Sequence, residues 1–172
     1  MIQKKIEKSL NTQIELEASS SQLYLSMASW AEVQGFNGVS QFLYKHADEE
    51  RIHMLKLFHY INERGGHGLV PALKQPPYKF SSVKEIFEEV YRHEKKVSSE
   101  INSLVDICLS EKDYTTHNFL QWYITEQIEE ENLAKNILDK IKLLGDDKGG
   151  LYMLDRDLET MATAIGGTAP SA

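Results

Sequence analysis

Carboxylate and imidazole side chains interrupt the apolar faces of the long segments of this sequence, at points where a helical core would otherwise be continuous. The apolar residues recur at alternating spacings of three and four, which lines one face of a helix. The polar residues that replace them, each near the middle of its segment, are Glu17, Glu50, His53, Glu94, Gln127 and Glu130. Helices packed side by side bring mid-helix positions into one layer, where an unpaired carboxylate is costly to ionise. This layer predicts bound cations.

The types of these side chains indicate which metal they suit. Glu50 and His53 stand three residues apart, so both project from the same face of a helix. Several carboxylates with a single imidazole suit iron or manganese at two adjacent positions, and we expect iron. Structural zinc favours more His or Cys ligands, and calcium favours a flexible loop. Di-iron bundles use two Glu-x-x-His pairs; here Gln127 and Glu130 replace the second, which predicts that one metal binds more loosely.

Five helices are predicted from the apolar periodicity and from the breaker residues between the periodic segments. Their approximate ranges are residues 5–34, 39–64, 82–109, 114–144 and 151–165, and no segment shows the alternation of a strand. Residues suited to helix ends agree with these limits. They are Asn37, Ser82 with Glu85, and Asp113 at N-termini, and Gly65 and Gly145 at C-termini.

The lengths of the connections predict the topology. Short connections make the first two helices antiparallel neighbours, and likewise the third and fourth. The segment from Gly66 to Phe80 can extend over roughly 50 Å, more than the roughly 40 Å of a helix of about 28 residues. The predicted fold class is therefore all-α, a single-domain four-helix bundle over 5–144 with one long crossover (up-down-down-up) and a short fifth helix over 151–165. The tail, 166–172, lacks apolar periodicity and is expected to be mobile.

The composition argues against several other classes of protein and site. A formal net charge of −7 and a pI near 5.4 argue against a nucleic acid or an anionic membrane surface as partner. Cys108 is the only cysteine, which excludes a disulfide framework, a cysteine-rich zinc site and an iron–sulfur ligand set. Charges interrupt every apolar stretch near the N-terminus, so neither a secretory signal nor a membrane span is expected there. We therefore expect a cytoplasmic protein.

Short motifs occur in order along nearly the whole chain. They are Glu17 with Tyr24, EERIHM at 49–54, YRHE at 91–94, FLQWYITEQIEEE at 119–131 and GGLYMLDRDLETM from Gly149. This set resembles the bacterial non-haem ferritins, members of the ferritin-like di-iron carboxylate family. The resemblance implies an iron storage protein that is also an enzyme, a ferroxidase. It would bind Fe(II) at a dinuclear centre, oxidise it with O2 and deposit ferric oxo-hydroxide in the cavity of a homo-oligomeric shell of 24 subunits.

The resemblance also implies the roles of individual residues in holding two irons per subunit. Glu17, Glu50 and His53 would hold one iron, and Glu50 would bridge to a second iron held by Glu94. The remaining catalytic residues are implied to lie close to the irons, with Tyr24 as a hydrogen-bond donor and source of an electron. They are Gln127, Glu130 and Tyr24.

A third, inner iron site is also implied, and its residues are separated by helical spacings of three and four that place side chains on a shared face. They are Glu49, Glu126, Glu129 and Glu130. Haem is not expected, because the haem-binding branch of the family has methionine and histidine where this sequence has Arg51 and Glu130.

The fifth predicted helix carries an apolar face of its own. Its residues are Leu151, Leu154, Leu158, Met161 and Ile165. Since four helices already close a core, this face is expected to dock against other subunits, and the resemblance implies a position near the fourfold axes of the shell.

Two other functions compete with iron storage. A di-iron oxygenase acting on an organic substrate would need an apolar pocket beside the metals, and a helical scaffold without metal would satisfy the central layer with hydrogen bonds alone. Tyr24 could also be a packing residue with a bonded hydroxyl. His46, one turn before Glu50, is interpreted as a hydrogen-bonded core histidine and not as a ligand.

Overall fold

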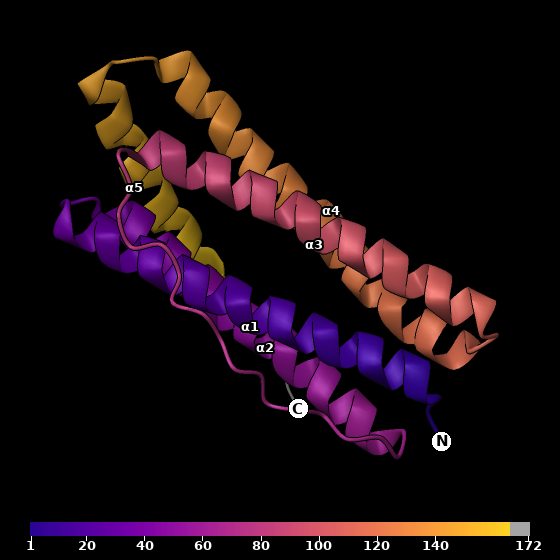
Figure 1. Cartoon of the computed structure of the whole chain (residues 1–172). Coiled ribbons are helices and arrows are strands. Elements are labelled where there is room, and N and C mark those ends of the chain that lie inside the picture. Colours follow the sequence, from indigo (N-terminus) through magenta and orange to yellow (C-terminus); the bar gives the residue numbers. More distant parts are fainter. Residues whose placement is uncertain (166–172) are drawn as a thin grey trace.

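The structure, a computed structural model, describes residues 1–165 of the chain and is built from helices (Figure 1). They are α1 (Lys4–Val33), α2 (Asn37–Glu63), α3 (Val83–Ser110), α4 (Tyr114–Leu144) and α5 (Lys148–Ile165). No strand occurs among the described residues, and none of these helices is both long and apolar enough to cross a membrane. The predicted tail mobility concerns 166–172, which lie outside the described residues. The predicted four-helix bundle with a short fifth helix is confirmed.

Most of the predicted helix ends are confirmed. The Ser82 hydroxyl accepts a hydrogen bond from the backbone N–H of Glu85 at 3.1 Å, and Asp113 Oδ1 accepts one from the N–H of Thr116 at 3.0 Å. Each bond satisfies a donor that the first turn of a helix leaves free. After α2, Gly65 has a φ of 75°, the left-handed conformation that ends many helices.

Two details of the helix ends differ from the prediction. Asn37 is not an N-cap, because α2 already begins at this residue and Phe36, in the capping position, makes no side-chain cap. The carboxylate of Glu85 accepts a hydrogen bond from the N–H of Ser81 at 2.6 Å, one residue before the Ser82 cap. The capping box of α3 is therefore completed through the preceding residue.

The connection between α2 and α3 runs back along α1 (Figure 1). Near its start, the N–H groups of His67 and Leu69 donate to the side chains of Glu7 and Asn11, at 3.0 and 2.7 Å. Near its end, the Ser26 hydroxyl donates to the carbonyl oxygen of Pro77 at 2.7 Å. Glu7 and Ser26 are about 29 Å apart along a helix that rises 1.5 Å per residue. The connection thus crosses most of the bundle, so that α2 and α3 run in the same direction.

The apolar core is divided into two clusters by a polar layer. One cluster includes the first half of α2 and of α3 and the second half of α1 and of α4; the other includes the opposite halves. The interval between the clusters falls at residues 14–23, 47–57, 90–97 and 123–134 of the four helices. Each interval contains predicted site residues, so the prediction that these residues share one level of the bundle is confirmed.

Helix α5 packs against its own chain, across the end of the bundle (Figure 1). Leu154, Leu158 and Ala162 are buried and belong to the first apolar cluster, together with residues of α2 and α4. The expectation that this apolar face needs another subunit is therefore wrong for its centre. Leu151 and Met161, at the edges of the face, are only partly buried. The sequence reveals an apolar face, but which surface covers it depends on the direction taken by the connection after α4.

A glycine permits α5 to approach the first turn of α2. A Cβ atom on Gly38 would lie 1.7 Å from the carbonyl oxygen of Asp155, which is far inside contact distance. Beside it, the N–H of Val39 donates to Asp155 Oδ1 at 2.9 Å. The carboxylate of α5 thus satisfies a free N–H at the positive end of the α2 dipole.

We predict that Gly38→Ala displaces α5 and destabilises the chain by about 1–3 kcal/mol, as overpacking typically does. Thermal unfolding should then move down by roughly 2–4 °C for each kcal/mol. The control is Gly149→Ala, since a Cβ there meets only Asp147 at 3.5 Å, an ordinary contact. Equal melting temperatures for the two variants would show that the Gly38 contact with α5 has no energetic importance.

Candidate metal centre

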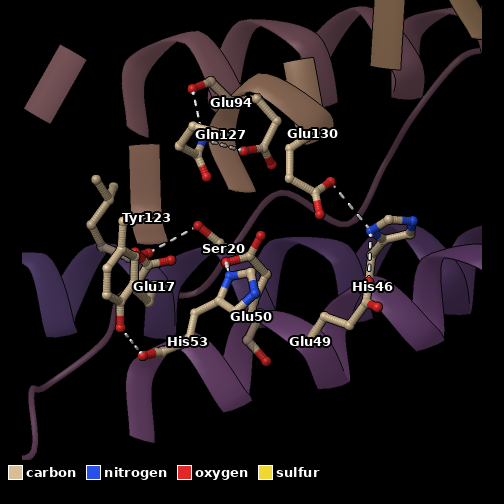
Figure 2. A network of polar contacts seen from close by, with 12 residues as sticks. Glu17, Ser20, His46, Glu49, Glu50, His53, Glu94, Tyr123, Gln127 and Glu130 are labelled. Atoms are coloured by element: carbon tan, nitrogen blue, oxygen red, sulfur yellow. Dashed lines mark hydrogen bonds and ion pairs between the residues drawn. The ribbon is translucent and has the colours of Figure 1, made fainter. Parts of the chain in front are cut away.

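The predicted site residues converge in the layer between the two apolar clusters (Figure 2). Helix α1 supplies Glu17 and Tyr24, α2 supplies Glu50 and His53, α3 supplies Glu94, and α4 supplies Gln127 and Glu130. Figure 2 shows Glu17, Glu50 and His53 on the α1 and α2 side, facing Glu94, Gln127 and Glu130 on the other side. The exposed fraction is 1% for Glu17 and Glu94 and 3% for Glu50. Water therefore contributes almost nothing to their solvation.

Glu17, Glu50 and His53 form a group with the geometry of metal ligands. One donor atom from each residue lies within 4.8 Å of the others. His53 Nδ1 is 3.5 Å from Glu50 Oε2. Two ligand atoms that are each about 2.1 Å from one ion, at a tetrahedral angle, are themselves about 3.4 Å apart. The group can therefore hold one divalent cation with little rearrangement.

Glu94 is held in place by two partners from different helices. The Tyr24 hydroxyl donates to Glu94 Oε1, and Gln127 Nε2 donates to Glu94 Oε2 at 2.9 Å. Both oxygens of this carboxylate are thus oriented before any metal binds. Hydrogen bonds of this kind to a ligating carboxylate fix its orientation and tune the metal that it binds.

Gln13 is a residue of the site that the sequence analysis missed. It is buried, and its Nε2 donates to Glu17 Oε1 at 2.8 Å. The other carboxylate oxygen, Glu17 Oε2, is buried and has no hydrogen-bond partner among the described residues. The position of Gln13, four residues before Glu17, was a usable signal in the sequence, because side chains with this spacing meet on a helix. The unpartnered oxygen fits a cation as its missing partner, which a hydrogen-bonded scaffold would not require.

Burial and mutual repulsion raise the pKa of every carboxyl group in the layer. Burial is the larger cause for Glu17, Glu50 and Glu94, and the neighbouring charges of Glu50 and Glu94 add to it for Glu17 and Glu50. For Glu130, burial followed by the charge of Glu94 raises the pKa to about 9. Without a cation, Glu130 therefore retains its proton near neutral pH. A divalent ion would displace this proton, and so its binding depends on pH.

The predicted inner residues are brought together only in part. Glu49 Oε2 and Glu130 Oε2 lie 3.3 and 3.5 Å from Nδ1 of His46, and the three residues form a second group with the geometry of metal ligands. Glu126 and Glu129 affect Glu130 through their charge, which raises its pKa further. Within the described part of the chain, neither of these two belongs to a ligand group of three.

His46 differs from the hydrogen-bonded core histidine that the sequence predicted. Burial lowers its pKa to about 4, so the ring is neutral at pH 7. Its Nε2 is buried and has no hydrogen-bond partner within residues 1–165, so the expectation of a satisfied ring is wrong for this nitrogen. The signals in the sequence were the position one turn before Glu50 and the spacing of three residues from Glu49.

The space beside the site is small. A cavity of about 10 Å³ adjoins the layer, between Tyr24, Phe42, Phe87 and Glu130. Pockets that bind organic ligands typically enclose about 300–1,000 Å³. The geometry therefore favours a site for ions over the oxygenase alternative.

Comparisons with known proteins point to one family. Residues 7–144 match the family model described as a ferritin-like domain. The chain is 47% identical over 163 residues to a probable bacterial non-heme ferritin-like protein of Haemophilus influenzae, covering 95% of this chain and 99% of the relative. It is 44% identical over 162 residues to a bacterial non-heme ferritin of Campylobacter jejuni, covering 94% and 97%. Among solved structures, it is similar to an open pore ferritin from the archaeon Archaeoglobus fulgidus, with a TM-score of 0.91, 42% identity and coverage of 92% and 98%.

We predict that removing one buried carboxyl group makes the metal-free protein less sensitive to alkaline pH. A carboxyl group whose pKa is raised on folding contributes its full stability to the folded chain below its unfolded pKa, 4.5. This contribution is lost progressively as pH rises toward its folded pKa, about 9 for Glu130. Metal-free Glu130→Gln should therefore gain stability relative to the parent chain between about pH 5 and pH 9, by at most about 1.4 kcal/mol per pH unit.

Denaturant unfolding over this pH range measures the effect. The matched control is Glu88→Gln, which changes an exposed glutamate on α3. Saturating Zn²⁺ should reverse the relative gain, because Glu130 then serves as an ionised ligand. A stability difference that does not change with pH would contradict a protonated, buried Glu130.

Proposed function

Because this chain belongs to the ferritin-like family, we propose that it is an iron storage protein with ferroxidase activity. It binds Fe(II) at a dinuclear centre, oxidises the iron with O2 and deposits ferric oxo-hydroxide in the cavity of a multi-subunit shell. The observation that carries this proposal is the buried layer of the bundle, in which donor atoms of Glu17, Glu50 and His53 lie within 4.8 Å of one another. Iron is the substrate here, and it supplies the redox chemistry with oxygen.

The two positions for iron differ in their surroundings. Glu17, Glu50 and His53 would hold the first, and the carboxylate of Glu50 would also serve the second. Glu94 belongs to the second position, with Gln127 and Glu130 beside it. Since Gln127 supplies an amide where the first position has an imidazole, the second iron is bound more weakly. A loosely held ion suits a centre that must release its product.

The chain's own groups move protons and maintain geometry during this reaction. The carboxyl groups of the layer release protons when Fe(II) enters, because their pKa values are raised in the metal-free state. Gln13 and Gln127 keep Glu17 and Glu94 oriented through bonds of 2.8 and 2.9 Å. Tyr24 donates a hydrogen bond to the other oxygen of Glu94, and this contact supports its proposed role as a source of an electron.

Exposed apolar side chains on α1 and on the crossover connection support assembly into a multi-subunit shell, for which we propose 24 subunits. Val33 and Val70 are 80% and 88% exposed. A groove between α1 and the connection is lined by Leu25, Trp30 and Tyr78, among others. Apolar surface of this kind is typical of contacts between proteins. Within this assembly, we place α5 near the fourfold axes, with its outer edge available to neighbouring chains.

We predict that Glu50→Ala and His53→Ala each abolish rapid, oxygen-dependent oxidation of Fe(II). Loss of a ligand should exceed the roughly 10–100-fold effect of losing a residue that only supports a ligand. The rate is measured by ferric absorbance and by oxygen consumption. Matched controls are Glu63→Ala and His59→Ala, which change exposed residues of the same helix. Parental rates in Glu50→Ala or His53→Ala would overturn the assignment of the centre.

We also predict that protein purified from iron-supplied cells carries a mineral load, as iron storage requires. Metal analysis of this material distinguishes the three functions. About two irons per chain would instead indicate an oxygenase, since each subunit of a di-iron bundle holds two. Protein without iron would indicate a scaffold.

A further inference from the structure

Two side-chain hydrogen bonds join α1 to α3 at the level of the metal layer. The Tyr24 hydroxyl donates to Glu94, and Ser20 Oγ lies 2.7 Å from Nε2 of His93. On α1 the two partners are about one turn apart, and on α3 they are adjacent, which places them about 100° apart around the helix. Two bonds in this arrangement resist both sliding and rotation of α3 against α1.

The bond between Ser20 and His93 has a defined direction. Ser20 is fully buried, and its hydroxyl also donates to the carbonyl oxygen of Leu16 at 3.1 Å. Since a hydroxyl carries a single proton, Ser20 accepts its second bond from the N–H at Nε2 of His93. The backbone of α1, the serine and the imidazole thus form one chain of hydrogen bonds, which fixes the ring of His93 on α1.

The ring of His93 also packs directly on Tyr24. The two rings meet edge to face, with centroids 6.0 Å apart and an angle of 78° between their planes. This is a geometry that aromatic pairs prefer. Because Tyr24 is 1% exposed and is packed in this way, its hydroxyl is held at Glu94.

The position of α3 on α1 matters because the layer takes its ligands from both halves of the bundle. Between the pair α1 and α2 and the pair α3 and α4, the most extensive contact is that of α1 with α3. Glu50 belongs to the first pair and Glu94 to the second. The separation of these two carboxylates, which the second iron position would bring together, is therefore set where α1 meets α3.

From this geometry we propose that Ser20 and His93 are positioning residues of the second iron position. Their hydrogen bond keeps α3 in register with α1, so that Tyr24 meets Glu94 and one ion can lie between Glu94 and Glu50. This role rests on the proposed function, since it presupposes a dinuclear centre. The two residues touch neither iron nor oxygen and act through Tyr24 and Glu94. The first iron position does not depend on their bond, because its ligands all come from α1 and α2.

Zn²⁺ is the probe, since it binds similar ligands without being oxidised. Crystals of the assembled, metal-free protein are soaked in limiting Zn²⁺, and anomalous scattering gives the occupancy at Glu94 relative to that at Glu17 and His53. In His93→Asn the amide ends near the place of Nδ1 and does not reach Ser20. This variant should weaken binding at Glu94 by about 10-fold, the lower end of the range for residues that orient a ligand. Unchanged occupancy at Glu17 serves as the internal control for folding.

His93→Gln tests whether the bond itself is responsible. Its amide nitrogen lies at about the place of Nε2 and can donate to Ser20, so this variant should restore the occupancy at Glu94. His59→Asn, which changes an exposed histidine of α2, should leave both positions as in the parent chain. A loss in His93→Gln as large as that in His93→Asn would overturn the proposed role.

Ser20→Ala tests the same bond from the side of α1. It removes only the hydroxyl group and should weaken binding at Glu94 as much as His93→Asn does. Because the two residues act as one unit, the double variant should lose no more than either single variant. Additive losses would show that the residues act separately and would contradict a shared positioning role.

Occupancy in the parent chain separates a failure of this role from a failure of the proposed function. Parent crystals without Zn²⁺ at either Glu17 or Glu94 would overturn the dinuclear centre, and the positioning role with it. Two occupied positions that lose Zn²⁺ equally in His93→Asn would overturn the positioning role alone. A selective loss at Glu94 supports the role whether or not the chain oxidises iron.

Discussion

The cost of burying carboxyl groups in the middle of a helical bundle determines most of what is distinctive in this chain. Glu17, Glu50 and Glu94 are almost fully buried, and burial raises the pKa of each. The charge of Glu50 raises the pKa of Glu17 further, and the charge of Glu94 does the same for Glu50. Apolar residues of similar volume would fold at least as well at such positions. The layer therefore lowers the stability of the metal-free bundle, and the apolar clusters on both sides of it compensate for that loss.

The layer itself was predictable because helix geometry connects sequence spacing to spatial level. Glu50 and His53 share a helical face at a separation of three, and Glu17 and Glu94 lie near the middle of helices of similar length. The orientation of each side chain within the layer was not predictable in this way. That Gln127 turns to Glu94 depends on the pairing of α3 with α4, which no local pattern encodes.

Two of the misses, at His46 and at α5, concern contacts between distant segments. His46 was interpreted as a hydrogen-bonded core histidine because the sequence does not show that Glu130, from another helix, faces its ring. The packing of α5 on α2 depends on Gly38. In the sequence Gly38 is only a residue between two predicted helices, whereas in the structure it permits close contact with Asp155. Asn37 failed as a cap because α2 begins one residue earlier than a capping role requires.

The arrangement of the helices in pairs has a mechanical consequence. Helix α1 packs mainly on α2, and α3 packs mainly on α4. The first pair supplies Glu17, Glu50 and His53, and the second pair supplies Glu94 and Glu130. If the layer holds ions as we propose, they would act as a removable cross-link between two halves of one molecule. Filling the centre would then stiffen the bundle and emptying it would loosen it, so that the metal content of a subunit would also be a measure of its rigidity.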